Sequence, residues 1–193
     1  MTGPVARGAG RWRSVGVLLL AVALLAACAR WNWREVRSVE DGWSASFPDK
    51  SQLTERDVSV LGRSLPMRMQ ASGQGATLFA VGVMHLPPEI ARDPAQRVAL
   101  LAWIEDGLER RFALRDLQRT EPALFVPPGR QLRAATAFSA RAAVGAERRA
   151  GTIAARLFIV DDRLYQVLAL GAEGELPPEV EDNFLASFRL LPR

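Results

Sequence analysis

The chain has little of the chemistry on which most catalytic and metal sites depend. Its 193 residues include one cysteine and one histidine, and aromatic residues make up only 7%. A single cysteine excludes a disulfide framework, a zinc ribbon and a catalytic pair built on a second thiol. The 49% of apolar and 24% of charged residues are typical of a globular protein, not of a disordered or polytopic one.

Lysine is almost absent as well, because Lys50 is the only one among the 25 basic residues. The remaining basic residues are arginines, which explain the high pI because guanidinium does not titrate in the usual range. Three of them, Arg7, Arg11 and Arg13, precede the first apolar run. Without this segment, 22 basic residues face 21 acidic ones. Since no basic stripe follows, we expect no nucleic-acid partner.

Residues 1–27 have the pattern of a secretory signal peptide. A basic stretch is followed by the uncharged apolar run 15–25, whose 11 residues lie within the range of about 7–15 that is usual for such signals. The uncharged stretch 14–29 has 16 residues, which is shorter than the roughly 20 needed to span a bilayer. The sequence therefore predicts export.

The signal ends in Leu25-Ala26-Ala27-Cys28, which resembles the lipobox of bacterial lipoproteins. This resemblance implies a diacylglycerol on the Cys28 sulfur, cleavage before Cys28 and acylation, typically with palmitate, of the new amine. The alternative is an uncleaved signal anchor with a buried Cys28. In Gram-negative lipoproteins an Asp after this cysteine favours the inner membrane, so Ala29 implies the periplasmic face of the outer membrane.

We expect residues 28–34 to form a short membrane-proximal tether, followed by a single α+β domain over 35–193. Trp31 and Trp33 alternate in the tether with arginine and asparagine. Indole rings favour the membrane interface, and arginine attracts anionic lipid. One interpretation is that the tether lies on the leaflet. The other is that Trp31 and Trp33 begin the first strand and pack into the core.

Alternating and apolar segments separated by turn residues predict antiparallel strands in the mature chain. Asp41-Gly42 and Asp161-Asp162 are turn signals between neighbouring strand segments. The predicted strands are 34–39, 43–47, 53–61, 65–71, 76–86, 130–140, 151–160 and 164–170.

Two helices are predicted. The first covers 94–112, with Asp93 as its cap and Pro94 at its first position. Its expected apolar stripe consists of Val98, Leu101, Ile104, Leu108 and Phe112. Trp103 points about 140° away from this stripe at 100° per residue, which indicates either a covering loop or a partner contact.

The second predicted helix opens at Pro177-Pro178 and carries Val180, Phe184 and Phe188 at four-residue steps. The order of strands, helix, strands and helix, with short turns between strands, predicts an α+β fold. We expect an antiparallel β-sheet flanked by helices.

Three segments resemble motifs of PsbP/Mog-type domains, which include the bacterial DcrB-like proteins. They are the strand Gly42-Trp43-Ser44-Ala45-Ser46-Phe47-Pro48, the strand Arg163-Leu164-Tyr165-Gln166-Val167 and the closing helix Phe184-Leu185-Ala186-Ser187-Phe188. Asp49-Lys50-Ser51 departs from the Gly and second Pro that many relatives carry there. The resemblance implies an α/β sandwich that serves as an accessory or docking module, and it supplies no active site.

The remaining candidates for chemistry have simpler structural explanations. His85 is expected to be a polar residue at a strand end, and Asp161-Asp162 to form a turn. The acidic Glu179-Val180-Glu181-Asp182 complements a helix start, and Gly73-Gln74-Gly75 lacks the third glycine of a dinucleotide site. We therefore expect no catalytic residue, cofactor or metal.

Two functions remain open. The first is a lipid-anchored, non-enzymatic envelope module that docks a protein partner, with Trp31, Trp33 and Trp103 as candidate contacts. The alternative is a ligand-binding or enzymatic lipoprotein that uses a cleft of the same domain. A flat apolar patch near Trp103 would favour docking, whereas a deep pocket with convergent charged groups would favour the alternative.

Overall fold

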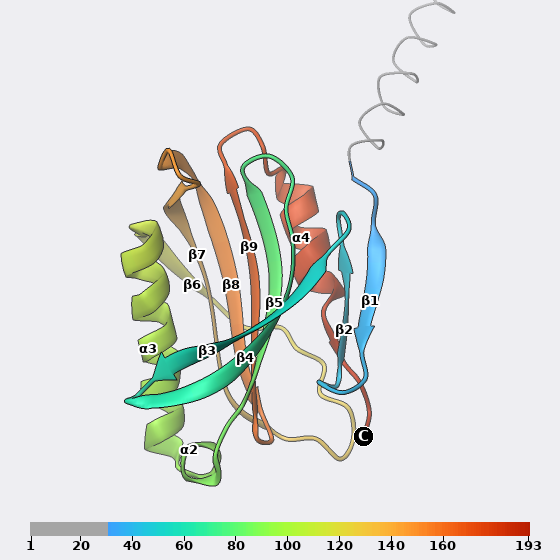
Figure 1. Ribbon diagram of the computed structural model, residues 1–193, viewed down its shortest axis with the longest axis vertical. Coiled ribbons are helices and arrows are strands. Elements are labelled where there is room, and N and C mark those ends of the chain that lie inside the picture. Colours follow the sequence, from blue (N-terminus) through green and yellow to red (C-terminus); the bar gives the residue numbers. More distant parts are fainter. Residues whose placement is uncertain (1–30) are drawn as a thin grey trace, which may run out of the picture. The chain divides into compact units, whose positions relative to one another are not determined.

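Nearly continuous apolar runs form the centre of a large antiparallel sheet (Figure 1). The computed structural model describes residues 31–193, of which Trp33–Arg193 form one compact unit. Strands β5 (Thr77–His85), β9 (Arg163–Ala172) and β8 (Arg149–Val160) lie next to one another and are buried along most of their length. Because both faces of these strands are covered, successive side chains are apolar, not only alternate ones.

Four more strands complete this sheet: β3 (Gln52–Val60), β4 (Arg63–Ser72), β6 (Arg115–Thr120) and β7 (Leu132–Val144). The order is β3-β4-β5-β9-β8-β7-β6, and every neighbouring pair is antiparallel. A small second sheet, in the order β1-β2-β10, contains β1 (Arg34–Ser38), β2 (Trp43–Phe47) and β10 (Arg189–Leu190).

Three helices are present in residues 31–193: α2 (Pro88–Arg92), α3 (Pro94–Phe112) and α4 (Pro178–Ser187). The Asp93 side chain accepts a hydrogen bond from the Ala95 N–H at 2.8 Å and so caps α3. Ala113 has a φ of 48°, in the left-handed region, and ends α3 there. The predicted bounds of this helix are therefore confirmed.

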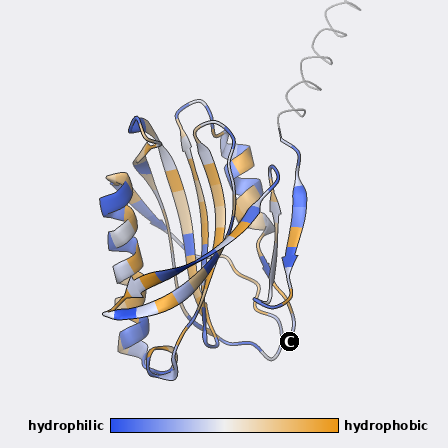
Figure 2. Cartoon of the chain, viewed as in Figure 1, coloured by the Kyte–Doolittle hydropathy of each residue, from blue (hydrophilic) through white to orange (hydrophobic). Residues whose placement is uncertain are grey.

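The large sheet has a hydrophobic core on each face. On one face α2 and α3 pack against it, and on the other face α4 and the small sheet do (Figure 1). Hydrophobic residues run along the central strands, whereas α3 alternates between polar and apolar positions (Figure 2). The α4 side holds an aromatic cluster: Trp43, Phe47, Phe79, Phe158, Tyr165, Phe184 and Phe188.

Phe188 is the centre of this aromatic cluster. Its ring stacks on Trp43 at 6.3 Å and on Phe158 at 6.1 Å between centroids. Phe184 contacts Phe47 at 5.2 Å. The three motifs singled out in the sequence therefore meet in one core, at β2, at β9 and at the end of α4. Phe188 lies just beyond this helix, in extended conformation, and not within it as predicted.

The α+β class and the antiparallel sheet flanked by helices are confirmed, and all eight predicted strands are present, β2 with the predicted bounds and the other seven with shifted ends. The short elements α2, β6 and β10 were not predicted. The expected α3 stripe was wrong at Val98, which is 65% exposed, and it missed Leu100, which is fully buried. The sheet lies against the α3 face that carries Arg97, Leu100 and Leu108, which turns Val98 to solvent.

Candidate functional site

The lipidation residue predicted from the sequence lies outside the described residues, as do the signal peptide 1–27 and Ala29. Of the tether, Trp33 is 37% exposed just before β1, and Trp31 is half-buried. No helix in residues 31–193 is long and apolar enough to cross a membrane.

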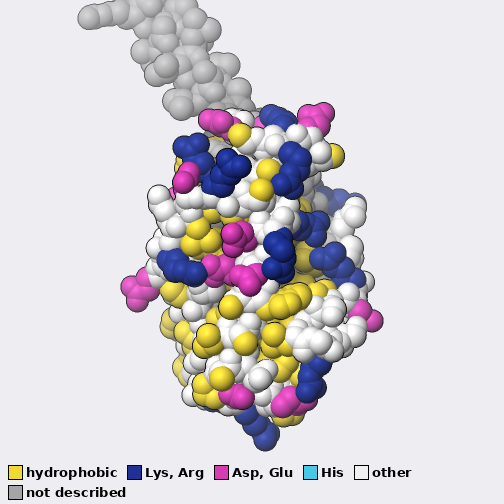
Figure 3. Space-filling view, turned by 90° about the vertical axis from the view of Figure 1, so that its left-hand side faces the viewer, with side chains coloured by type: hydrophobic (Ala, Val, Ile, Leu, Met, Phe, Trp, Pro, Cys, Tyr) yellow, Lys and Arg dark blue, Asp and Glu magenta, His cyan; other side chains and the backbone are white. Residues whose placement is uncertain are grey.

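Trp103 is half-buried and packs against the core on the α3 side. It lies one turn beyond Leu100, at the flank of the buried face and not opposite to it. On the molecular face that α3 occupies, apolar side chains are exposed over much of the lower half, and charged ones gather in the upper half and at the rim (Figure 3).

The acidic pair Asp161-Asp162 occupies the β8–β9 turn, as predicted. Asp161 has a φ of 57°, and its carboxylate accepts hydrogen bonds from Arg130 Nε at 3.1 Å and from the Gln131 N–H at 2.9 Å. These bonds give Asp161 a structural role. His85 is exposed at the end of β5, and no group of three or more metal-ligating side chains occurs in residues 31–193.

Arg130 is the centre of the network to which Asp161 belongs. Its guanidinium donates to the carbonyl oxygens of Gly42 at 3.1 Å and Leu191 at 3.2 Å, and to the Tyr165 hydroxyl at 2.8 Å. The Tyr165 hydroxyl in turn donates to the Asp41 carbonyl oxygen at 2.8 Å. This network ties the small sheet and the C-terminal segment to the large sheet, so its role is stability.

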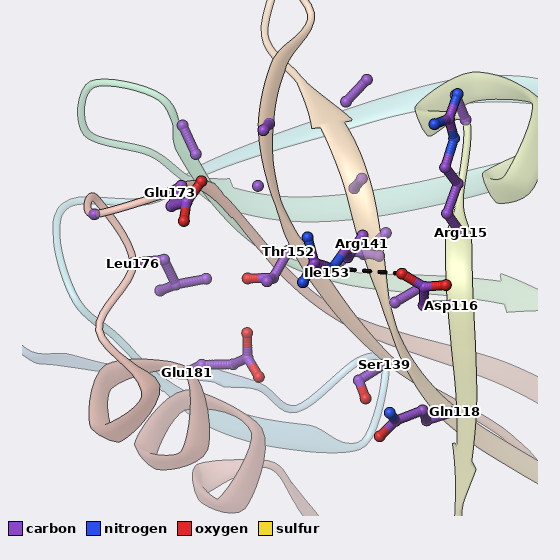
Figure 4. A pocket seen from close by; sticks show the side chains of 18 of the residues that line it. Arg115, Asp116, Gln118, Ser139, Arg141, Thr152, Ile153, Glu173, Leu176 and Glu181 are labelled. Atoms are coloured by element: carbon purple, nitrogen blue, oxygen red, sulfur yellow. Dashed lines mark ion pairs between the residues drawn. The ribbon is translucent and has the colours of Figure 1, made fainter.

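A groove on the side of α4 that faces the edge strand β6 is the best candidate for a functional site (Figure 4). Its floor is the sheet face over β7 and β8. One wall is formed by α4 and the preceding 173–176 turn, and the other wall by the edge strand β6. We call it the α4–β6 groove. Its volume is about 750 Å³, within the range of roughly 300–1,000 Å³ that is typical of ligand sites.

The groove exists because the sheet face beside α4 carries several small side chains, and no helix in residues 31–193 covers it there. In β7, Phe138, Ala140, Ala142 and Val144 belong to the core on the α3 side. Strand alternation turns the intervening residues toward α4. Of these, Ser139 and Ala143 line the floor together with Thr152 of β8. Helix α4 itself packs on β9 and β2, so β6 and β7 remain open.

Charged side chains come from both walls of the groove. On the β6 wall Arg115 lies in register with Arg141 of β7, and Arg141 Nε pairs with the Asp116 carboxylate at 3.4 Å. On the α4 wall the carboxyl group of Glu181 points into the groove (Figure 4). Burial and the neighbouring Asp182 charge raise the pKa of Glu181.

Chemically, this arrangement is suited to holding a polar ligand by hydrogen bonds and charge. Gln118 and Ser139, which are in register on β6 and β7, add neutral donors and acceptors beside the floor. The described residues of the groove contain no cysteine and no histidine, so a nucleophile with an adjacent imidazole base is not formed here.

Comparison with known proteins adds no assignment: no protein-family model matches the chain, and no significantly similar sequence was found among the curated proteins.

Sequence reasoning missed the α4–β6 groove. Its charged residues include Arg115, Arg141 and Glu181, which are far apart in the chain and come together only through the sheet order and the position of α4. Glu181 had been assigned to the acidic start of a helix, where it does lie. One signal was present: in the stretch 134–143 six of the ten residues are alanine, so few large side chains cover this part of the strand.

Proposed function

We propose that this protein is a lipid-anchored envelope protein that acts as a non-enzymatic docking or assembly module, with the α4–β6 groove as its docking site. In this proposal the signal peptide 1–27 is removed, acyl chains on Cys28 hold the chain in the membrane, and Ala29 directs it to the periplasmic face of the outer membrane. The observation that carries docking is the open groove with charged side chains on both walls.

The architecture supports a PsbP/Mog-type domain as the finer description of the fold. A seven-stranded antiparallel sheet lies between helices, as that resemblance implies. The three motif segments supply the aromatic residues Trp43, Phe47, Tyr165, Phe184 and Phe188 to one core. Their positions are explained by packing, which agrees with a family whose motif residues are structural.

The volume and the charged lining of the groove also favour the second candidate, a lipoprotein that binds a small ligand there. The two candidates differ in what occupies the groove, a segment of another protein or a free small molecule. The groove is open along one side of the sheet and lined by Arg115, Arg141 and Glu181, which suits an extended segment better than an enclosed small molecule.

The anchor is tested by metabolic labelling with a radioactive fatty acid. We expect label in the natural chain and none in Cys28→Ser. Density-gradient fractionation should place the natural chain in the outer membrane, and Ala29→Asp should move it to the inner membrane. Continued labelling of Cys28→Ser would contradict lipidation, and inner-membrane enrichment of the natural chain would contradict the sorting proposal.

Docking is tested by chemical crosslinking in intact cells, followed by purification and identification of the co-purifying envelope proteins. Thr152→Trp places a large ring on the groove floor, and Thr54→Trp makes the same change at an exposed position of the distant edge strand β3. We expect the crosslinked partner to be lost in Thr152→Trp and kept in Thr54→Trp. An unchanged set of partners in both variants would contradict docking in the groove.

A further inference from the structure

The two walls of the α4–β6 groove carry opposite charges that their own neighbours do not balance. Arg115 lies on the β6 wall, with its side chain running along the strand, and Glu181 projects into the groove from α4, with Glu173 in the turn before that helix (Figure 4). Arg141 projects between them from β7. A ligand that complements this arrangement needs a positive group on one side and a negative group on the other.

The β6 wall has one carboxylate for two guanidinium groups. Arg115 and Arg141 are directly opposite each other in the antiparallel pair of β6 and β7. Like charges at such positions destabilise a sheet. Asp116 pairs with Arg141 at 3.4 Å, which leaves Arg115 without a carboxylate partner in residues 31–193. An acidic group entering the groove would reduce this repulsion.

The α4 wall has an excess of negative charge. Glu181 is half-buried beside the Asp182 carboxylate. Arg156 donates to the Leu185 carbonyl oxygen at 3.0 Å and is attracted by Asp182. No ion pair to Glu181 is formed within the described part of the chain. A basic group that reaches Glu181 would gain a charge-assisted hydrogen bond in a partly dry site.

The floor between the walls leaves room for a main chain. Ala143 carries only a methyl group, and Ser139 and Thr152 offer hydroxyl groups that donate or accept hydrogen bonds. Successive side chains of an extended peptide point in opposite directions. A peptide that runs along this floor therefore presents adjacent residues to opposite walls.

We propose that the α4–β6 groove binds an extended peptide segment in which a basic and an acidic residue are adjacent, the basic one at Glu181 and the acidic one at Arg115. This inference rests on the proposed docking function and specifies the partner by its chemistry. In this inference each wall of the groove recognises one residue of the pair. One substitution on each wall can therefore test the two contacts separately.

The experiment uses the full lipidated chain, purified in detergent and immobilised, to select from a phage library of random hexapeptides. We expect enrichment of Lys or Arg directly next to Asp or Glu. Glu181→Gln should remove the preference for the basic residue only, and Arg115→Gln the preference for the acidic residue only. Each variant should lower the affinity for the selected peptides about tenfold.

The matched controls are Glu179→Gln on the exposed side of the same helix turn and Arg110→Gln in the last turn of α3, neither of which lines the groove. Both should select the same peptides as the natural chain. Thermal unfolding of every variant separates loss of binding from loss of folding.

A selection without adjacent opposite charges, or one that Glu181→Gln and Arg115→Gln leave unchanged, would overturn the inference. If crosslinking in cells still places a partner in the groove, the docking function stands and only this partner chemistry is wrong. If charged pairs are selected in vitro but crosslinking finds no partner in cells, the inference stands and the docking function is wrong.

Discussion

Arg130 shows how one buried side chain holds two sheets together. Its side chain is only 3% exposed and bonds to the β1–β2 turn, the β8–β9 turn, β9 and the segment after β10. In a buried network of this kind, removing one charged partner leaves the others without their hydrogen bonds, which costs more than the pair itself contributes.

Arg130→Ala should lower the free energy of unfolding by about 3–5 kcal/mol. The control is Arg119→Ala, which removes a pair with Glu105 in which the arginine is 62% exposed. That change should cost at most about 1 kcal/mol. Urea denaturation of the unlipidated Cys28→Ser chain measures both, and equal effects of the two substitutions would contradict the structural role of Arg130.

Glu181 gives a pH-dependent prediction, because burial and Asp182 raise its pKa in the folded state. Below the unfolded pKa of about 4.3 the carboxyl group is protonated in both states and carries no penalty. As the pH rises through the folded pKa, the folded state must hold a partly buried charge, and stability falls. The penalty is therefore present at neutral pH and absent in acid.

Glu181→Gln should accordingly raise the Tm at pH 7, and the gain should shrink toward zero as the pH falls to about 4. Thermal unfolding at several pH values measures this, with the exposed Glu179→Gln as control. A gain that persists in acid, or a lower Tm at pH 7, would mean that burial of Glu181 does not control its ionisation.

At the scale of elements, α3 carries a glycine that its surroundings do not require. A Cβ built on Gly107 meets nothing within 4 Å, whereas one on Gly151 of β8 would lie 2.2 Å from the Gly171 carbonyl oxygen. Glycine in a helix interior costs about 0.5–1 kcal/mol relative to alanine. Gly107 therefore has no packing role, whereas the close approach of the neighbouring strand β9 requires a glycine at position 151.

Gly107→Ala should stabilise the chain by about 0.5–1 kcal/mol, which corresponds to a rise in Tm of roughly 1–4 °C for a chain of this size. Gly151→Ala should destabilise it by about 1–3 kcal/mol through overpacking. Differential scanning calorimetry of both variants checks the pair, and a destabilising Gly107→Ala would reveal a contact at this position that the structure does not contain.

The long elements were predictable because their signals are local. The cap at Asp93 and the spacing of Leu101, Ile104 and Leu108 define α3, and the Asp161-Asp162 turn defines the last hairpin. The strand β6 was not predictable, since its sequence Arg115–Thr120 is polar and exposed as an edge strand. The burial of Arg97 was not predictable either, because it depends on a tertiary contact. Its guanidinium donates to the Ala91 carbonyl oxygen at 2.9 Å, and its apolar stem packs inside.

At the scale of the whole molecule, the proposed anchor could be predicted from the sequence, whereas the groove could not. Lipidation depends on a continuous segment that ends at Cys28, which an enzyme reads locally. The groove depends on Arg115, Arg141 and Glu181, whose proximity follows from the strand order and from the position of α4. Only a fold brings such residues together, so no spacing in the sequence marks them.

The proposed anchor also predicts contact between the start of the domain and lipid. Trp33 is 37% exposed just before β1, and at most about 20 Å of extended chain separates it from Cys28. Anionic vesicles added to the unlipidated Cys28→Ser chain should shift its tryptophan emission to the blue. The shift should disappear in Trp33→Phe. An equal shift in both chains would contradict an interfacial role for Trp33.

The central claim is that the α4–β6 groove docks a partner in the cell envelope, and site-specific photocrosslinking tests it most directly. A photoreactive amino acid is placed at Thr152 on the groove floor, at Gln118 on the β6 wall, or at Thr54 on the opposite edge of the sheet. Illumination of intact cells should give the same protein adduct from Thr152 and Gln118 and none from Thr54. Adducts from Thr54 alone, or none from either groove position, would contradict the account.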